Sequence, residues 1–276
     1  MLTKRKYSPP RPGGGGFPLA FSRTAAYNAE GKEGTVLKKK VRPLAAAAAL
    51  LLTAALGFLL YASVYYHADE TALSALRPDG SVSVSRTDYG YWFDGPAEDA
   101  ALIFYPGGKV EAEAYAPLLH RLAAGGLDVC LVRMPLRFAF LGKDRASAVM
   151  EAHGYEHWYV GGHSLGGAVA ALYAADNAEA LDGLVLCAAY PTKPLDPSLT
   201  EVSLVGSEDG VLAHDKLEAG RAFAPPRCRE FVLEGGNHAL FGSYGPQRGD
   251  GEALLTPEEQ WDESARDILE ALARAA

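Results

Sequence analysis

One serine lies in a pentapeptide whose residue types and spacing suit nucleophilic chemistry. The segment is Gly162-His163-Ser164-Leu165-Gly166, and the apolar run Trp158-Tyr159-Val160 precedes it. If a strand turns sharply into a helix here, Ser164 lies at the apex, and side chains two positions to either side would clash. Glycine at both positions removes the clash. The pattern therefore predicts a serine nucleophile on a strand-to-helix turn.

A serine hydroxyl attacks a carbonyl carbon only when a base removes its proton and a carboxylate orients that base. Both groups follow Ser164 in the chain. The strand-like run 202–205 leads into an acidic loop with Asp209, and the run 230–233 leads into a glycine-rich loop with His238. Because loops at the carboxyl ends of parallel strands meet at one edge of a sheet, we expect these side chains to converge. His238 is then the predicted general base, and Asp209 is the predicted acid.

The sequence leaves the choice of the acid open. Glu208 is the neighbour of Asp209, and the direction of a side chain on a loop cannot be read from sequence. Asp182 and Asp196, which are tied to the preceding strand, are more distant alternatives. We expect His163 to be a packing residue. The histidines without a matching loop after a strand are expected on the surface or in helices, and they are His120, His153, His157 and His214.

Attack on a carbonyl also creates an oxyanion, which needs hydrogen-bond donors already in place. The backbone N–H of Leu165, at the start of the helix after the serine, is one expected donor. The second is expected from the loop 106–109, which follows the apolar run 101–105. We favour the amide of Gly108, with Lys109 as the neighbouring alternative. The Lys109 side chain could also meet an anionic substrate at the mouth of the site.

From residue 81 onward, strand-like and helix-like segments alternate, which is typical of βαβ units around a mostly parallel sheet. The expected strands are 81–85, 89–93, 101–105, 127–132, 158–160, 184–189, 202–205 and 230–233. The expected helices are 113–124, 144–152, 165–175 and 257–273, the last with Thr256 and Glu259 as a candidate capping box. The predicted fold class is α/β, with one sheet flanked by helices.

Together these residues resemble the α/β-hydrolase superfamily, in its small, dienelactone-hydrolase-related form. The segments that carry the resemblance are 104–108 with 113–115, 162–167, 206–210 and 236–238. The resemblance covers residues 81–275 and implies a serine hydrolase of esters or related acyl compounds that needs no cofactor. Two departures stand out. Pro106-Gly107 replaces the usual His-Gly, and Ser164 stands where dienelactone hydrolases proper have cysteine, which puts that specific substrate in doubt.

An uncharged apolar segment, residues 44–66, precedes the predicted catalytic domain, residues 67–276. A helix of this length would span about 34 Å, enough to cross a bilayer core of about 30 Å. Lys38, Lys39, Lys40 and Arg42 lie before the segment, and Asp69 and Glu70 lie after it. The positive-inside rule then predicts a single-pass cell-membrane protein with a cytoplasmic N-terminus and an extracytoplasmic catalytic domain. A cleaved signal peptide and a buried helix of a soluble protein are the alternatives.

Charge divides the chain into two parts. Residues 1–43 hold ten of the 26 Lys and Arg residues and two of the 34 Asp and Glu residues, and they are rich in Pro and Gly. We expect this basic tail to be disordered and cytoplasmic. The remaining sixteen basic and thirty-two acidic residues lie beyond it. An acidic body repels phosphate backbones, so we expect no nucleic-acid partner.

The cysteines and histidines show no metal-binding spacing, and we expect no metal or other cofactor. Cys130 and Cys187 lie in apolar strand-like runs, as buried thiols do. The segments 134–142 and 190–199 follow strand ends and would either line a pocket or pack as ordinary loops.

The leading hypothesis is a membrane-anchored serine hydrolase that acts on a small-molecule acyl substrate. The alternatives are an acyltransferase with the same three residues and a non-catalytic binding module on the same fold. Oligomeric state and substrate identity stay open.

Overall fold

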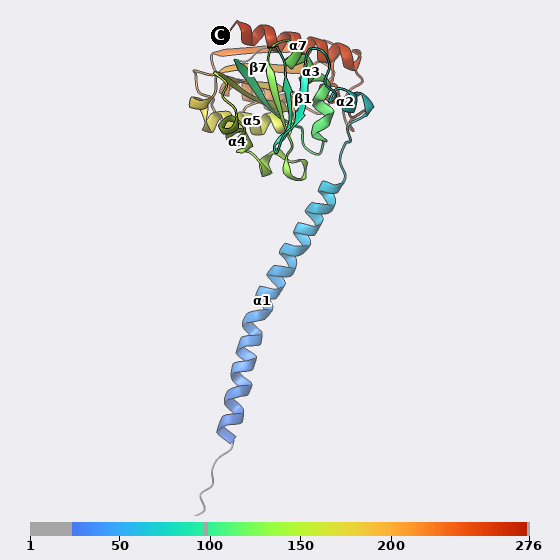
Figure 1. Cartoon of the computed structure of the whole chain (residues 1–276). Coiled ribbons are helices and arrows are strands. Elements are labelled where there is room, and N and C mark those ends of the chain that lie inside the picture. Colours follow the sequence, from blue (N-terminus) through green and yellow to red (C-terminus); the bar gives the residue numbers. More distant parts are fainter. Residues whose placement is uncertain (1–23, 97–98, 275–276) are drawn as a thin grey trace, which may run out of the picture. The chain divides into compact units, whose positions relative to one another are not determined.

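The computed structural model describes residues 24–96 and 99–274, with side chains described from residue 44 onward. The chain divides into two compact units between Gly57 and Phe58, and each is treated separately. Figure 1 shows the first as part of a long helix and the second as a sheet with helices on both faces.

Helix α1 runs from Thr24 to Ser63 and contains the predicted anchor. Among the described residues it is the one helix long and apolar enough to cross a membrane, over Leu44–Ser63. The predicted span of 44–66 is too long at its end. Tyr66 leaves the helix and bridges to Val110, donating its amide hydrogen to the Lys109 carbonyl at 2.8 Å. Tyr66 therefore belongs to the folded unit.

The tail differs in part from the expectation. Residues 24–43, which we predict to be disordered, are helical as the first half of α1. Their many Ala, Glu and Lys residues are strong helix formers. The prediction used the composition of residues 1–43 as a whole, in which the Pro- and Gly-rich stretch before residue 24 outweighs this preference. Residues 1–23 of the predicted tail lie outside the described residues.

The second unit is built on an eight-stranded sheet of order β1-β2-β4-β3-β5-β6-β7-β8. The strands are β1 Ser83–Arg86, β2 Gly90–Asp94, β3 Ala100–Tyr105, β4 Asp128–Val132, β5 His157–His163, β6 Gly183–Cys187, β7 Thr200–Gly206 and β8 Arg227–Leu233. β2 pairs antiparallel with both β1 and β4, and all the other pairings are parallel. The predicted mostly parallel sheet is confirmed, with strand ends that shift by a few residues.

Within the described residues, six α-helices follow α1: α2 Glu70–Ser74, α3 Ala116–Ala124, α4 Arg145–Ala152, α5 Leu165–Asp176, α6 His214–Gly220 and α7 Pro257–Ala273. The predicted helix 113–124 is two elements, a 3-10 helix at Ala112–Tyr115 and then α3. Pro117, in the first turn of α3, explains the break because its ring clashes with a preceding helical turn. The capping box of Thr256 and Glu259 at the start of α7 is present.

Strand β3 shows why the central strands read as unbroken apolar runs. Leu102 and Phe104 belong to the core that α3 and α7 cover, whereas Ala101, Ile103 and Tyr105 belong to the core under α4 and α5. Figure 1 shows α3 and α7 on one face of the sheet and α4 and α5 on the other. Both faces are buried, so period-two alternation disappears. The carboxyl ends of β3, β5, β7 and β8 then lie along one edge.

Candidate active site

Ser164 occupies the strand-to-helix turn between β5 and α5. Its backbone lies at φ 52° and ψ −123°, a conformation that few non-glycine residues adopt. A Cβ added at Gly162 or Gly166 would lie 2.4 Å or 2.1 Å from the Tyr105 carbonyl oxygen. Only glycine fits at these two positions, which is the reason proposed from the sequence. The turn holds Ser164 at the carboxyl edge of the sheet, where its side chain is half-buried.

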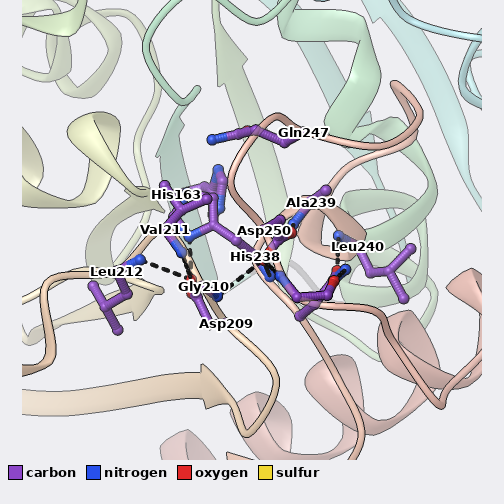
Figure 2. Close-up of polar contacts among 12 residues, drawn as sticks. His163, Asp209, Gly210, Val211, Leu212, His238, Ala239, Leu240, Gln247 and Asp250 are labelled. Carbon is purple, nitrogen blue, oxygen red and sulfur yellow. Dashed lines mark hydrogen bonds and ion pairs between the residues drawn. The ribbon is translucent and has the colours of Figure 1, made fainter.

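Asp209 and His238 come together beneath this edge from the loops after β7 and β8. His238 Nδ1 lies 2.8 Å from Asp209 Oδ2, and both side chains are buried. The other carboxylate oxygen, Oδ1, accepts hydrogen bonds from the amides of Val211 at 2.9 Å and Leu212 at 2.8 Å. Figure 2 shows this loop wrapped around the Asp209 carboxylate, with the His238 ring against it. Both carboxylate oxygens of Asp209 therefore have partners: Oδ1 the two backbone amides, and Oδ2 the His238 ring.

The other candidate acids lie elsewhere. Glu208 is exposed and accepts a hydrogen bond from Ser207 Oγ at 3.0 Å. Asp182 accepts from the Trp158 amide at 3.0 Å, at the beginning of β5, and Asp196 caps its own turn at Ser198. Of the carboxylates that the sequence leaves open, the structure brings Asp209 to His238.

Two opposing effects act on the Asp209 carboxyl. Burial raises its pKa, but the hydrogen bond and charge of His238 and the two amide hydrogen bonds outweigh burial and hold the pKa below its ordinary value. The carboxylate is consequently ionised at neutral pH. An ionised Asp209 keeps the hydrogen of His238 on Nδ1 and leaves Nε2 free to accept a proton.

Asp250 is a second acidic residue at this site, and it is absent from the residues predicted from the sequence. Its carboxylate accepts hydrogen bonds from the amides of Ala239 at 2.8 Å, Gly210 at 3.1 Å and His238 at 3.3 Å. One side chain thus ties the loop that carries Asp209 to the loop that carries His238 (Figure 2). The only local signal is a carboxylate between glycines, Gly249-Asp250-Gly251, which is common in unrelated turns.

His163 does more than pack. Its ring is buried beside that of His238, with centroids 4.4 Å apart, and its Nδ1 lies 2.8 Å from Tyr115 Oη. Burial, and then the neighbouring His238, hold the pKa of His163 well below its ordinary value, so the ring is neutral. The Tyr115 oxygen also accepts the Gly107 amide hydrogen at 3.0 Å. We infer that the Tyr115 hydroxyl donates its hydrogen to His163 Nδ1. Tyr115 then links the strand-to-helix turn between β5 and α5 to the loop after β3.

That loop contains the predicted second oxyanion donor. The amide of Gly107 is bonded to Tyr115, and the amide of Lys109 donates to the Arg137 carbonyl at 3.0 Å. Within the described part of the chain, the Gly108 amide between them has no acceptor, which favours Gly108 over Lys109. A Cβ at Gly108 would lie 2.8 Å from Leu165 Cδ2, so the two predicted donor residues are neighbours. As the first residue of α5, Leu165 has an amide without an intrahelical acceptor.

The last expected contact is not formed. No hydrogen bond joins Ser164 Oγ to His238 Nε2, although Ser164 directly follows His163, whose ring touches that of His238. In enzymes without bound substrate such hydrogen bonds are often long and tighten on binding. The structure thus brings Ser164, His238 and Asp209 to one edge and joins two of the three.

Comparison with known proteins decides the family. A model of the alpha/beta hydrolase family matches residues 101–262, more than half of the chain. This chain belongs to the alpha/beta hydrolase family. The matched residues include Ser164, Asp209 and His238 and leave out α1.

Solved structures share the fold of this α/β hydrolase at low sequence identity. A bacterial membrane phospholipase A, described as a virulence factor, is 14% identical with a TM-score of 0.54, over 88% of this chain and 99% of that one. A carboxylesterase from Bacillus subtilis is 12% identical with a TM-score of 0.50, over 74% and 95%. A dienelactone hydrolase from Anabaena variabilis is 16% identical with a TM-score of 0.50, over 71% and 97%. No curated protein sequence matches the chain.

A pocket of about 360 Å³ lies beside the loop after β3 in this α/β hydrolase. Pro106, Met134, Leu136 and Arg137 are among its lining residues. The segment 134–142 therefore contributes to a pocket wall, one of the two roles considered from sequence. In the other segment, 190–199, Leu195 donates its amide hydrogen to the Phe223 carbonyl at 2.9 Å, and the choice between its two expected roles stays a prediction.

The residues that the sequence excluded from catalysis lie in unrelated surroundings. Cys130 and Cys187 are buried free thiols whose pKa burial raises to about 12, so they are protonated at neutral pH. Among residues 44–96 and 99–274, no group of three or more His, Cys, Asp or Glu side chains is placed to hold a metal ion.

Proposed function

We propose that this α/β hydrolase is a serine hydrolase that cleaves a carboxylic ester of a small acyl substrate through a covalent acyl-enzyme. The observation that carries the proposal is the buried Asp209–His238 pair at 2.8 Å, placed beside the turn that holds Ser164 at φ 52°. A nucleophile, a base and an orienting acid in the chain order Ser, Asp, His match the arrangement of this fold.

The proposed reaction follows from these contacts. His238 Nε2 takes the proton of Ser164 while Oγ bonds to the carbonyl carbon, and the ionised Asp209 stabilises the resulting imidazolium. The amides of Gly108 and Leu165 donate to the oxyanion. His238 then protonates the leaving alcohol. Water, activated by the same histidine, releases the acid and restores Ser164.

We further propose that α1 anchors the enzyme in a membrane, with the N-terminus cytoplasmic and the catalytic unit outside. The uncharged stretch Leu44–Ser63 and the basic residues before it support this topology. Protease added to intact cells should digest residues 68–276. Full protection of that region until the cells are lysed would contradict the orientation.

Hydrolysis of a series of p-nitrophenyl esters of increasing acyl length tests the proposed activity. The wild-type chain should release p-nitrophenol together with the free acid, and Ser164→Ala should release neither. Equal rates for the two proteins would contradict the proposal. Capture of the acyl group by an added alcohol in preference to water would assign the site to an acyltransferase instead.

A further inference from the structure

The loop that follows β4 presents large apolar side chains to the outside. Leu136, Phe140 and Leu141 are 41%, 51% and 43% exposed. Leu136 also has a left-handed backbone, with φ 50°, a conformation that costs a leucine free energy. We call residues 134–142 the apolar loop. Exposed apolar side chains that gather on one short loop mark a candidate site of contact with a membrane or another protein.

The apolar loop borders the candidate active site. Its Arg137 carbonyl accepts the Lys109 amide hydrogen at 3.0 Å, one residue from the predicted oxyanion donor Gly108. Leu136 and Arg137 line the pocket of about 360 Å³ together with Pro106. Whatever covers the apolar loop therefore lies next to that pocket.

The same loop packs against the end of the apolar span. Its Phe138 ring is buried, with centroids 5.4 Å from that of Phe58 and 6.2 Å from that of Tyr61. Phe58 and Tyr61 belong both to the span Leu44–Ser63 and to the compact unit that begins at Phe58. The Phe138 ring also contacts that of the exposed Phe140, with centroids 5.2 Å apart, so these aromatic rings join Phe58 and Tyr61 to the exposed part of the apolar loop.

Two cations accompany these aromatic rings. Lys109 Nζ lies 3.8 Å from the centroid of the Tyr61 ring, and the Arg137 guanidinium lies 3.2 Å from that of Tyr65. Neither cation forms an ion pair with a carboxylate within the part of the chain whose side chains are described. Tyrosines at either end of a span are typical of the membrane interface, and long basic side chains near a span end also reach the lipid headgroups. Both cations are thus placed to meet a lipid phosphate.

We propose that the substrate is an acyl ester of a phosphate-bearing lipid, taken from the bilayer that holds Leu44–Ser63. The apolar loop enters the bilayer surface and the phosphate lies near Lys109 and Arg137. This inference rests on the proposed serine hydrolase and its anchor. Ser164 Oγ bonds to the fatty-acyl carbonyl carbon, the ester bond to glycerol breaks, and His238 protonates the glycerol oxygen. Water then cleaves the acyl-enzyme, so the products are a lysophospholipid and a fatty acid.

The test uses the full chain reconstituted in vesicles of phosphatidylcholine and phosphatidylglycerol. Two rates are measured on each preparation: release of lysophospholipid, by mass spectrometry, and hydrolysis of water-soluble p-nitrophenyl acetate. The double variant Phe140→Ser/Leu141→Ser should lower the ratio of the first rate to the second at least tenfold. The matched control is Val232→Ser, which removes an exposed apolar side chain from the edge strand β8 and should keep the wild-type ratio.

A second pair of measurements tests the cations. Arg137→Gln should lower the cleavage of phosphatidylglycerol several-fold relative to diacylglycerol, an ester without phosphate, in the same vesicles. Equal losses on both lipids would overturn the assignment of the phosphate to Arg137.

Failure of the proposed phospholipid substrate can be told apart from failure of the proposed serine hydrolase. If the wild-type chain cleaves p-nitrophenyl acetate but releases no lysophospholipid, the inference fails and the hydrolase stands. If the soluble ester is not cleaved, or Ser164→Ala cleaves it, the proposed function itself fails. An unchanged ratio in the double variant would overturn the role of the apolar loop. A lowered ratio that accompanies the dissociation of a dimer would assign the loop to a second copy of the chain and overturn docking to the bilayer.

Discussion

Strand β7 carries a buried carboxylate near each of its ends, and the two behave in opposite ways. Glu201, near the beginning of the strand, is 3% exposed, and its Oε2 has no hydrogen-bond partner among the residues whose side chains are described. Burial, and then the nearby Glu230, raise the pKa of Glu201 to about 7. Asp209, in the loop after the strand, is also 3% exposed. His238 and two backbone amides hold its pKa below the ordinary value.

The comparison shows that burial alone does not make a carboxylate useful for catalysis. Both groups lose water, which disfavours the charged form. The difference comes from the partners that the two edges of a parallel sheet supply. At the carboxyl edge, loops with free amides and a histidine surround Asp209, whereas Glu201 lies within the strand, where the ladder has already engaged the backbone amides.

Of these substitutions, Asp209→Asn should have the largest effect, because it removes the carboxylate that contacts His238. An amide cannot hold the correct tautomer of His238, and kcat/KM on a p-nitrophenyl ester should fall about a thousand- to ten-thousand-fold. Because the pKa of Asp209 is depressed, its charge stabilises the fold above its ordinary pKa of 3.8. That contribution is lost as the pH falls toward the folded-state pKa. The difference in free energy of unfolding between variant and wild type should therefore become smaller as the pH falls. A loss in kcat/KM of less than tenfold would contradict the role of Asp209.

Glu201→Gln should change stability, and the pH dependence of that change should be opposite to the one expected for Asp209→Asn. With a pKa of about 7 against an ordinary 4.5, Glu201 stabilises the fold fully below about pH 4.5, and that stability is lost as the pH rises through 7. At pH 8 the loss is on the order of 3 kcal/mol, which the variant avoids because it does not ionise. Thermal unfolding in detergent at pH 4.5 and pH 8 measures the difference. A variant that gains nothing at pH 8 relative to pH 4.5 would contradict the raised pKa.

Asp250→Asn probes the carboxylate that ties the two catalytic loops together. The variant keeps one acceptor oxygen but turns an NH₂ group toward amides that now donate to Asp250. We expect a loss of about 1–2 kcal/mol in stability and about tenfold in kcat/KM. Unfolding and ester hydrolysis measured on the same preparation check both values. If neither changes, Asp250 does not hold the loops that carry Asp209 and His238.

Much of the fold could be predicted because periodicity is a local property. The unbroken apolar run of β3 marks a strand that is buried on both faces, and the run 230–233 marks the carboxyl-terminal half of β8. The end of the span was misplaced by three residues, since nothing in the composition of Val64–Tyr66 shows that the Tyr66 backbone bonds to Lys109 and Glu111. A hydrogen bond between residues more than forty positions apart, such as Tyr66 and Lys109, cannot be predicted from the sequence around either one.

The candidate site also contains residues that the local sequence predicts and residues that depend on contacts between distant loops. Ser164 and His238 could be predicted because glycines mark their turns. The acid could be narrowed to Asp209 or its neighbour Glu208, with Asp182 and Asp196 as more distant alternatives. The structure separates Asp209 from Glu208 by the direction of the side chain, which depends on the fold of the loop. Asp250 and the Tyr115 hydroxyl act through contacts between distant loops. Residue types and spacing could not reveal them.

Covalent labelling of the full chain with a fluorophosphonate tests whether Ser164 is the nucleophile. One label should attach to the peptide that contains Ser164, His238→Ala should slow the labelling by orders of magnitude, and Ser164→Ala should abolish it. No labelling of the wild-type chain, or labelling that persists in Ser164→Ala, would contradict the role of Ser164.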